Sequence, residues 1–232
     1  MKDKEMDEIL EQAARTPHHV DPALLDRVSA SLGASLRPVH PLLPSWVLEG
    51  SVAAIAVAIA IAGAARAGFY GIEKLGTVER ALIFPALGVF LWLAAAAWVA
   101  ENIPGSRRRV STIALLLVAT MTILTIFAGL FRDYRTDHFV SAGIACLLTG
   151  LLHAIPAALL GWLVLRRGFA VDSTAAGLAA GTLAGLAGVA MLELHCPNFQ
   201  AMHILIWHTA VLPVSAAAGA LLAWRLSFRT SS

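Results

Sequence analysis

The residues best suited to chemistry stand in one stretch, ELHCPNFQAMHILIWH, at positions 193–208. It carries one cysteine and three histidines between long runs of Ala, Leu, Gly and Val: His195, Cys196, His203 and His208. Thiolate and imidazole groups bind soft or borderline metal ions such as zinc, copper or cadmium. The chain has one further cysteine, Cys146, so a single disulfide is a second possible use of these residues.

Helical spacing leaves the chemistry of this stretch open. His203 and His208 are five positions apart, about 140° round an α-helix, so they are expected to point in different directions. A structural role, in which the histidines bond to carbonyls of neighbouring helices, is therefore a third possibility. His153 shares a helix face with Cys146 but lies deeper, and it is expected to be such a helix-to-helix hydrogen bonder. Glu193 and Glu49 stand near the ends of apolar runs, from which a carboxylate can reach the membrane interface.

The composition is that of an integral membrane protein. The chain has 232 residues, of which 58% are hydrophobic and only 14% are charged, and its mean hydropathy is +0.75. Soluble domains carry about 25% charged residues. The net charge of +2 gives no argument for binding nucleic acid, and two cysteines are too few for a disulfide scaffold.

The apolar residues form six runs, each long enough to cross a hydrocarbon core, which takes about 20 residues. We therefore predict an all-α membrane protein whose transmembrane domain covers 46–224, with spans near 46–65, 81–100, 110–131, 140–165, 175–194 and 203–224.

The Lys and Arg residues predict the orientation, because cytoplasmic flanks carry an excess of them. With the N-terminus in the cytoplasm, 12 of the 17 Lys and Arg residues fall in cytoplasmic segments. Both termini are then cytoplasmic, including a tail at 225–232. The same orientation puts Cys146 and Cys196 in the outer half of the membrane with the three histidines.

Three glycines at four-residue spacing, Gly177, Gly181 and Gly185, form a flat face on the fifth span. Such a face lets another helix approach closely in a membrane. We expect it to pack inside the bundle, and dimerisation through this face is the alternative.

Residues 1–45 differ from the rest because they are polar and predict two short amphipathic helices. Their apolar stripes are formed by Met6, Ile9, Leu10, Leu25, Val28, Leu32 and Leu36. Two such helices are too short to be stable alone. The acidic first helix disfavours an anionic membrane surface, so we expect a soluble partner protein to cover the stripes.

No pattern of an enzyme is present. The sequence contains neither a Cys-x-x-Cys pair nor the His-Glu-x-x-His pattern of zinc proteases. Two alternatives remain: a small transporter or metal-handling protein with a histidine-lined path, and an intramembrane redox enzyme, which would need a bound haem or quinone.

The segment LRPVHPLLP, the six spans, the cysteine in the fourth span and HCPNFQAMHILIWH together resemble the NrsF family, negative regulator of sigma F. The resemblance covers nearly the whole chain. It implies a bacterial inner-membrane anti-sigma factor that holds an extracytoplasmic-function sigma factor inactive. The part of the family that binds the sigma factor matches residues 1–45.

The resemblance also implies a sensing role for two residues. In the family, paired cysteines on the periplasmic side are implicated in sensing, notably of heavy-metal stress, and they match Cys146 and Cys196. His203, Trp207 and His208 match the accompanying motif. The implied protein is not an enzyme, does not contact nucleic acid directly and needs no resident cofactor, although transient heavy-metal or zinc binding is compatible with its residues.

Overall fold

The computed structural model describes residues 21–35, 43–103, 105–106, 110–165 and 172–229, together with Glu11 and Ala170. The chain divides into two compact units, Met1–Leu42 and Leu43–Ser232, and each is described by itself. Four of the predicted partner-binding residues lie outside the described residues: Met6, Ile9, Leu10 and Leu36.

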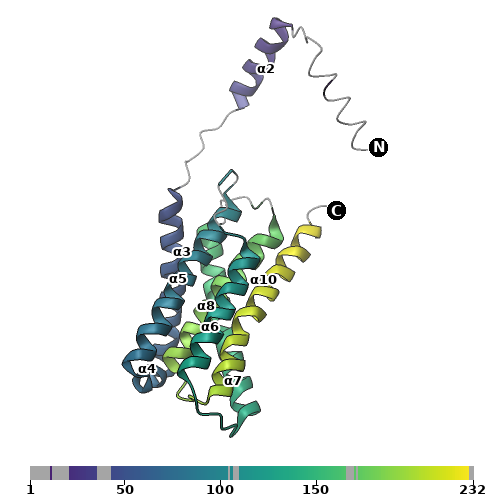
Figure 1. Ribbon diagram of the computed structural model, residues 1–232. Helices are drawn as coiled ribbons and strands as arrows, with labels where there is room; N and C mark the ends of the chain where they lie inside the picture. Colours follow the sequence, from purple (N-terminus) through teal and green to yellow (C-terminus); the bar gives the residue numbers. More distant parts are fainter. Residues whose placement is uncertain are drawn as a thin grey trace. The chain divides into compact units, whose positions relative to one another are not determined.

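The second unit is a bundle of long helices that run side by side (Figure 1). Its helices are α3 (Ser45–Ala67), α5 (Thr77–Asn102), α6 (Thr112–Leu130), α7 (Phe139–Leu165), α8 (Ser173–His195) and α10 (Thr209–Arg229). Six described segments are long and apolar enough to cross a membrane, the last running from Ala201 to Leu226. The predicted all-α membrane fold is therefore confirmed. Helices suit this setting because each satisfies its backbone hydrogen bonds internally.

Three short elements lie at one end of the bundle, which we call the α4 end. The helix α4 (Tyr70–Lys74) connects α3 to α5, while α9 (Ala201–His203) and the π-helical turn η1 (Ile204–His208) lead into α10. The chain enters α3 at the opposite end. The helix α10 continues to Arg229, so the predicted tail at 225–232 begins as helix.

The central helix of the bundle is α8, which packs against α3, α5, α7 and α10. Inside the bundle, 78% of its most apolar stretch is buried, against 22% for α6 and for α7. A side chain at Gly181 would collide with the carbonyl oxygen of Ser215 in α10. A Cβ atom at Gly185 would lie 2.9 Å from the Cα atom of Leu212, and one at Gly177 would collide with the carbonyl of Gly219. The glycine face of α8 thus lets α10 approach closely.

In the first unit, the helix α2 (Pro22–Ser35) follows a capping residue, Asp21. The Asp21 carboxylate accepts a hydrogen bond from the backbone N–H of Ala23 at 2.9 Å, and Pro22 occupies the first helical position. Leu25, Val28 and Leu32 repeat at helical spacing and are each about half exposed, at 53%, 46% and 57%. An apolar stripe therefore remains on the surface of α2.

Candidate metal and thiol site

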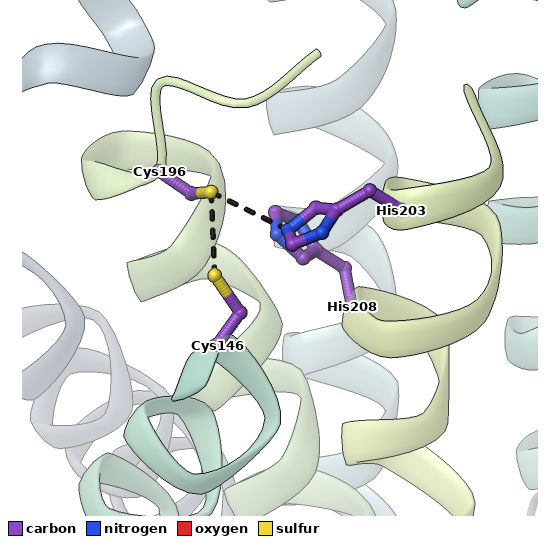
Figure 2. A group of neighbouring side chains, drawn as sticks. All are labelled: Cys146, Cys196, His203 and His208. Atoms are coloured by element: carbon purple, nitrogen blue, oxygen red, sulfur yellow. Dashed lines mark hydrogen bonds between the residues drawn. The ribbon is translucent and has the colours of Figure 1, made fainter. Parts of the chain in front are cut away.

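Two thiols and two imidazoles converge at the α4 end of the bundle (Figure 2). The sulfur atoms of Cys146 and Cys196 are 3.4 Å apart, and neither is in a disulfide. The Cys196 sulfur lies 3.7 Å from Nε2 of His203. With one ring nitrogen of His208, these atoms all lie within 4.8 Å of one another. Among the described residues this is the one group of three or more His, Cys, Asp or Glu side chains with the geometry to hold a metal ion.

The convergence of the two histidines corrects the expectation from helical spacing. His203 and His208 do not point apart; their ring centroids are 5.3 Å apart in an edge-on contact. The cause is the π-helical turn η1, in which the N–H of Thr209 donates to the carbonyl of Ile204, five residues earlier. A π-turn holds more residues than an α-turn, so positions five apart come onto the same side. Pro213 lies one turn further on, inside α10, and has no N–H to donate to the carbonyl of Thr209.

The loop that carries Cys196 is held against the connection between α6 and α7. The ring of Phe199 stacks on Phe131, with centroids 5.6 Å apart. The N–H of Ala201 donates to the carbonyl of Asp133 at 2.6 Å. These contacts fix the loop backbone where α8 ends and α9 begins.

Cys146 is positioned by α7, whose turns at the α4 end pack on η1. Gly143, three residues before Cys146, lies against the indole of Trp207, and any larger side chain there would collide with that ring. The ring of Phe139 also contacts Trp207, at a centroid distance of 5.5 Å. Gly143 thereby lets α7 approach η1 closely enough to bring the Cys146 sulfur to that of Cys196.

Glu193 is a member of the site that sequence reasoning missed. Its side chain does not reach the interface; it is 1% exposed, and Oε1 lies 2.7 Å from Nδ1 of His208. Glu49 was expected at the interface as well, and it too is buried, with 7% exposed at the opposite end of the bundle. An ionisable residue in a spanning segment is a functional candidate by default. That was the one feature of the sequence that pointed to Glu193. Its pairing with His208 depends on tertiary structure.

Two other histidines lie outside the cluster: His195, which the sequence made a candidate ligand, and His153, which it did not. His195 turns away from the sulfur atoms, and its Nδ1 hydrogen bonds to the carbonyl oxygen of Gly68 at 3.0 Å. His153 bonds through Nδ1 to the carbonyl of Thr149 in its own helix at 2.8 Å, rather than to a neighbouring helix. Its ring does abut α3, at Gly63.

The site is buried except for Cys146, which is half-buried, and several of its hydrogen-bonding positions are unused. Cys196, His203 and His208 are 4%, 0% and 1% exposed. Nε2 of His208 and Oε2 of Glu193 are buried and have no hydrogen-bond partner. The hydrogen bond with Cys146, and then burial, raise the pKa of Cys196 above its usual value. Without a ligand, Cys196 is therefore a neutral thiol at neutral pH.

This arrangement supports two kinds of chemistry, which exclude each other. A disulfide would bring the sulfur atoms from 3.4 Å to the bond length of about 2.05 Å. A metal ion would instead take both sulfurs as thiolates and keep them apart.

Among protein families, the one described as negative regulator of sigma F, NrsF, matches residues 32–227. No curated protein and no solved structure matches the chain. The family match covers more than half of the chain, including all six spanning helices up to Leu226 and all four residues of the cluster. This chain, a helical membrane protein with a buried cysteine and histidine cluster, belongs to the NrsF family of negative regulators of sigma F.

Proposed function

We propose that this protein is a membrane anti-sigma factor with a thiol-based switch. Residues 1–45 hold a sigma factor of the extracytoplasmic-function class inactive. A thiophilic metal ion or an oxidant engaging Cys146 and Cys196 releases it. The observation that carries the proposal is the pair of sulfur atoms 3.4 Å apart at the end of the bundle, in a member of a family of sigma-factor regulators.

The helix α2 supports the role of the N-terminal segment. Leu25, Val28 and Leu32 form a stripe that is about half exposed, and a helix of 14 residues gains little stability without a partner. An amphipathic helix commonly binds by laying its apolar face into a groove of another protein. A sigma factor bound in this way would be unable to engage RNA polymerase.

We place the protein in the bacterial inner membrane, and the excess of Lys and Arg near one set of span ends supports an orientation with both termini in the cytoplasm. In that orientation the α4 end faces the periplasm. Oxidising conditions prevail there, and thiols on that side are exposed to oxidation and to incoming metal ions.

A route from the switch to the N-terminal segment runs along α3. The far end of α3 is tied to the site, because His195 bonds to Gly68 and α4 packs on the end of α8. A Cβ atom on Gly71 would lie 2.5 Å from the carbonyl oxygen of Glu193 and 2.9 Å from that of Cys196. Movement at Cys196 therefore acts on the corner between α3 and α4, and α3 begins where the N-terminal segment ends.

The proposal is tested by co-purification. The full-length protein, solubilised in detergent, is mixed with candidate sigma factors from its operon neighbourhood, beside a variant that lacks residues 1–40. We expect the full-length chain to retain one sigma factor and the shortened chain to lose it. Cadmium or a mild oxidant should release the sigma factor from the wild type but not from Cys146→Ser or Cys196→Ser.

A matched pair of substitutions in α2 separates recognition from helix stability. Leu25→Asp puts a charge on the apolar stripe, whereas Ala30→Asp puts the same charge on the opposite side of the helix. We expect only Leu25→Asp to abolish retention. Retention of a sigma factor by neither the wild type nor any variant would overturn the proposed function.

A metal transporter with a histidine-lined path has less support. The two histidines of the cluster gather at one end of the bundle rather than along it, and His153 bonds to its own helix.

A further inference from the structure

The cluster of two cysteines and two histidines has the dimensions of a four-coordinate metal site. Zinc binds thiolate sulfur at about 2.3 Å and imidazole nitrogen at about 2.0–2.1 Å in a tetrahedral arrangement, so its ligand atoms lie about 3.3–3.8 Å from one another. Two of the distances here are already 3.4 and 3.7 Å, and none exceeds 4.8 Å. Closing the four atoms on one ion therefore requires shifts of about 1 Å or less.

His208 has the hydrogen-bonding arrangement that is typical of a metal-binding histidine. Its Nδ1 bonds to the Glu193 carboxylate at 2.7 Å, and its Nε2 is buried without a partner. Metal-ligating histidines almost always bond through their other ring nitrogen to a carboxylate or carbonyl, which fixes the tautomer and the ring orientation. The free Nε2 is the nitrogen that this hydrogen bond leaves for a metal.

The position of Glu193 needs an explanation beyond packing. Its side chain is 1% exposed in the helix with the largest buried fraction, and one of its two oxygens has no hydrogen bond. Carboxylates in spanning segments are costly and rare. Its other oxygen bonds to His208, and both residues are buried beside the two thiols.

We propose that Cys146, Cys196, His203 and His208 form one closed site for a single four-coordinate ion, such as Zn²⁺ or Cd²⁺, with Glu193 as the positioning residue for His208. The inference rests on the proposed function in that it takes the same cysteine pair as the sensor, and it names the ligand class. Two sulfurs with two imidazoles suit a borderline or soft ion and not Mg²⁺ or Ca²⁺, which take oxygen ligands. With four protein ligands, no coordination position remains for a substrate.

The test uses the full-length protein in detergent and the metal alone. Co²⁺ is titrated as a spectroscopic probe, and Zn²⁺ and Cd²⁺ affinities are measured by competition with a chelator. We expect one ion per chain, visible bands of tetrahedral Co²⁺, and thiolate charge-transfer bands in the ultraviolet. Bound Zn²⁺ should also slow formation of the disulfide, because it holds both sulfurs. A Co²⁺ spectrum unchanged in the double variant His203→Ala, His208→Ala would overturn the four-ligand site.

Glu193 is tested with three variants. Glu193→Leu removes the carboxylate and should weaken Zn²⁺ binding by about 10–100-fold while the Co²⁺ bands shift. Glu193→Gln keeps an oxygen acceptor for Nδ1 and should recover part of the affinity. Glu49→Gln, at another buried carboxylate, should bind as the wild type does. Wild-type affinity in Glu193→Leu would remove Glu193 from the site, whatever that variant does to thermal stability.

The two proposals fail separately. If the protein releases a sigma factor on oxidation but binds no Zn²⁺, Cd²⁺ or Co²⁺, the anti-sigma function stands and the metal site is wrong. If it binds one tetrahedral ion through all four residues but retains no sigma factor, the metal site stands and the function is wrong.

Discussion

At the scale of single residues, the contact between the two sulfur atoms predicts intramolecular oxidation. Disulfide formation requires the Cys146 and Cys196 sulfurs, 3.4 Å apart, to approach by about 1.4 Å. We expect a mild oxidant to convert the metal-free protein to a monomeric disulfide form. The measurement is labelling with a thiol-reactive polymer after denaturation, which shifts the reduced chain on a gel but not the oxidised one.

Cys196→Ser is the control for this prediction, because its one remaining thiol can be labelled in the monomer under every condition. Two labelled thiols in the oxidised wild-type monomer would contradict the expectation. Such a result would mean that the sulfur atoms do not meet in the membrane.

Residue types alone single out four of the five residues that the structure brings together, and also His195, which lies outside the cluster. Cysteine and histidine are recognisable in an apolar sequence, and Cys146, Cys196, His203 and His208 were all selected. That both histidines face one point could not be predicted, because the α-helical angle separates them and only the π-turn brings them together. The burial of Glu193 could not be predicted either, because its place near a span end suggests the interface, whereas α8 is the central helix of the bundle.

At the scale of the elements, the glycine face of α8 predicts a sharp difference between two alanine substitutions. Gly181→Ala adds a methyl group that collides with the backbone of α10 at Ser215, and overpacking of this kind costs about 1–3 kcal/mol. Gly88→Ala in α5 meets no atom within 4 Å, and alanine favours a helix over glycine by about 0.5–1 kcal/mol. We expect thermal unfolding in detergent at a lower temperature for Gly181→Ala and at an unchanged or higher one for Gly88→Ala.

An equal response of the two alanine variants would show that α8 and α10 do not pack closely through Gly181. Dimerisation through this face, the alternative left open by the sequence, would then regain support, and a cross-linking measurement of the oligomeric state would test it.

The contact of α4 with the end of α8 predicts an effect on the thiols from a residue that is not a ligand. In Gly71→Ala, the added methyl group would lie 2.5 Å from the carbonyl of Glu193 and 2.9 Å from that of Cys196, so the backbone there must shift. We expect slower disulfide formation and weaker retention of the sigma factor than in the wild type. Both are measured with the oxidation and co-purification assays described above.

Gly129→Ala is the matched control, because Gly129 lies at the end of α6 and its added methyl group meets nothing within 4 Å. Wild-type behaviour of Gly71→Ala in both assays would exclude the corner between α3 and α4 as the route of the signal.

At the scale of the whole molecule, hydropathy was sufficient to predict the helices of the bundle, because each spanning helix must be apolar along about 20 residues. The predicted span 175–194 and the observed helix Ser173–His195 differ by two residues at one end and one at the other. The packing order of the helices was not predictable in this way. All six spans are apolar, and the small residues of α8 were the one sign that this helix, rather than α6, has neighbours on several sides.

The proposed coupling between metal binding and sigma-factor binding leads to a last prediction, through thermodynamic reciprocity. If a metal ion weakens the binding of the sigma factor by some factor, the bound sigma factor must weaken the binding of the metal by the same factor. Moving the protein from 1:99 to 99:1 in favour of the releasing state needs a difference in metal affinity of about 10⁴-fold, or about 5.5 kcal/mol.

The Cd²⁺ affinity of the complex should therefore be far lower than that of the free protein, whereas the variant lacking residues 1–40 should bind Cd²⁺ equally well with and without sigma factor. Competition titrations with and without saturating sigma factor measure this directly. Equal Cd²⁺ affinities for the full-length protein would mean that metal binding and sigma binding are independent, and that any release by cadmium proceeds through another site.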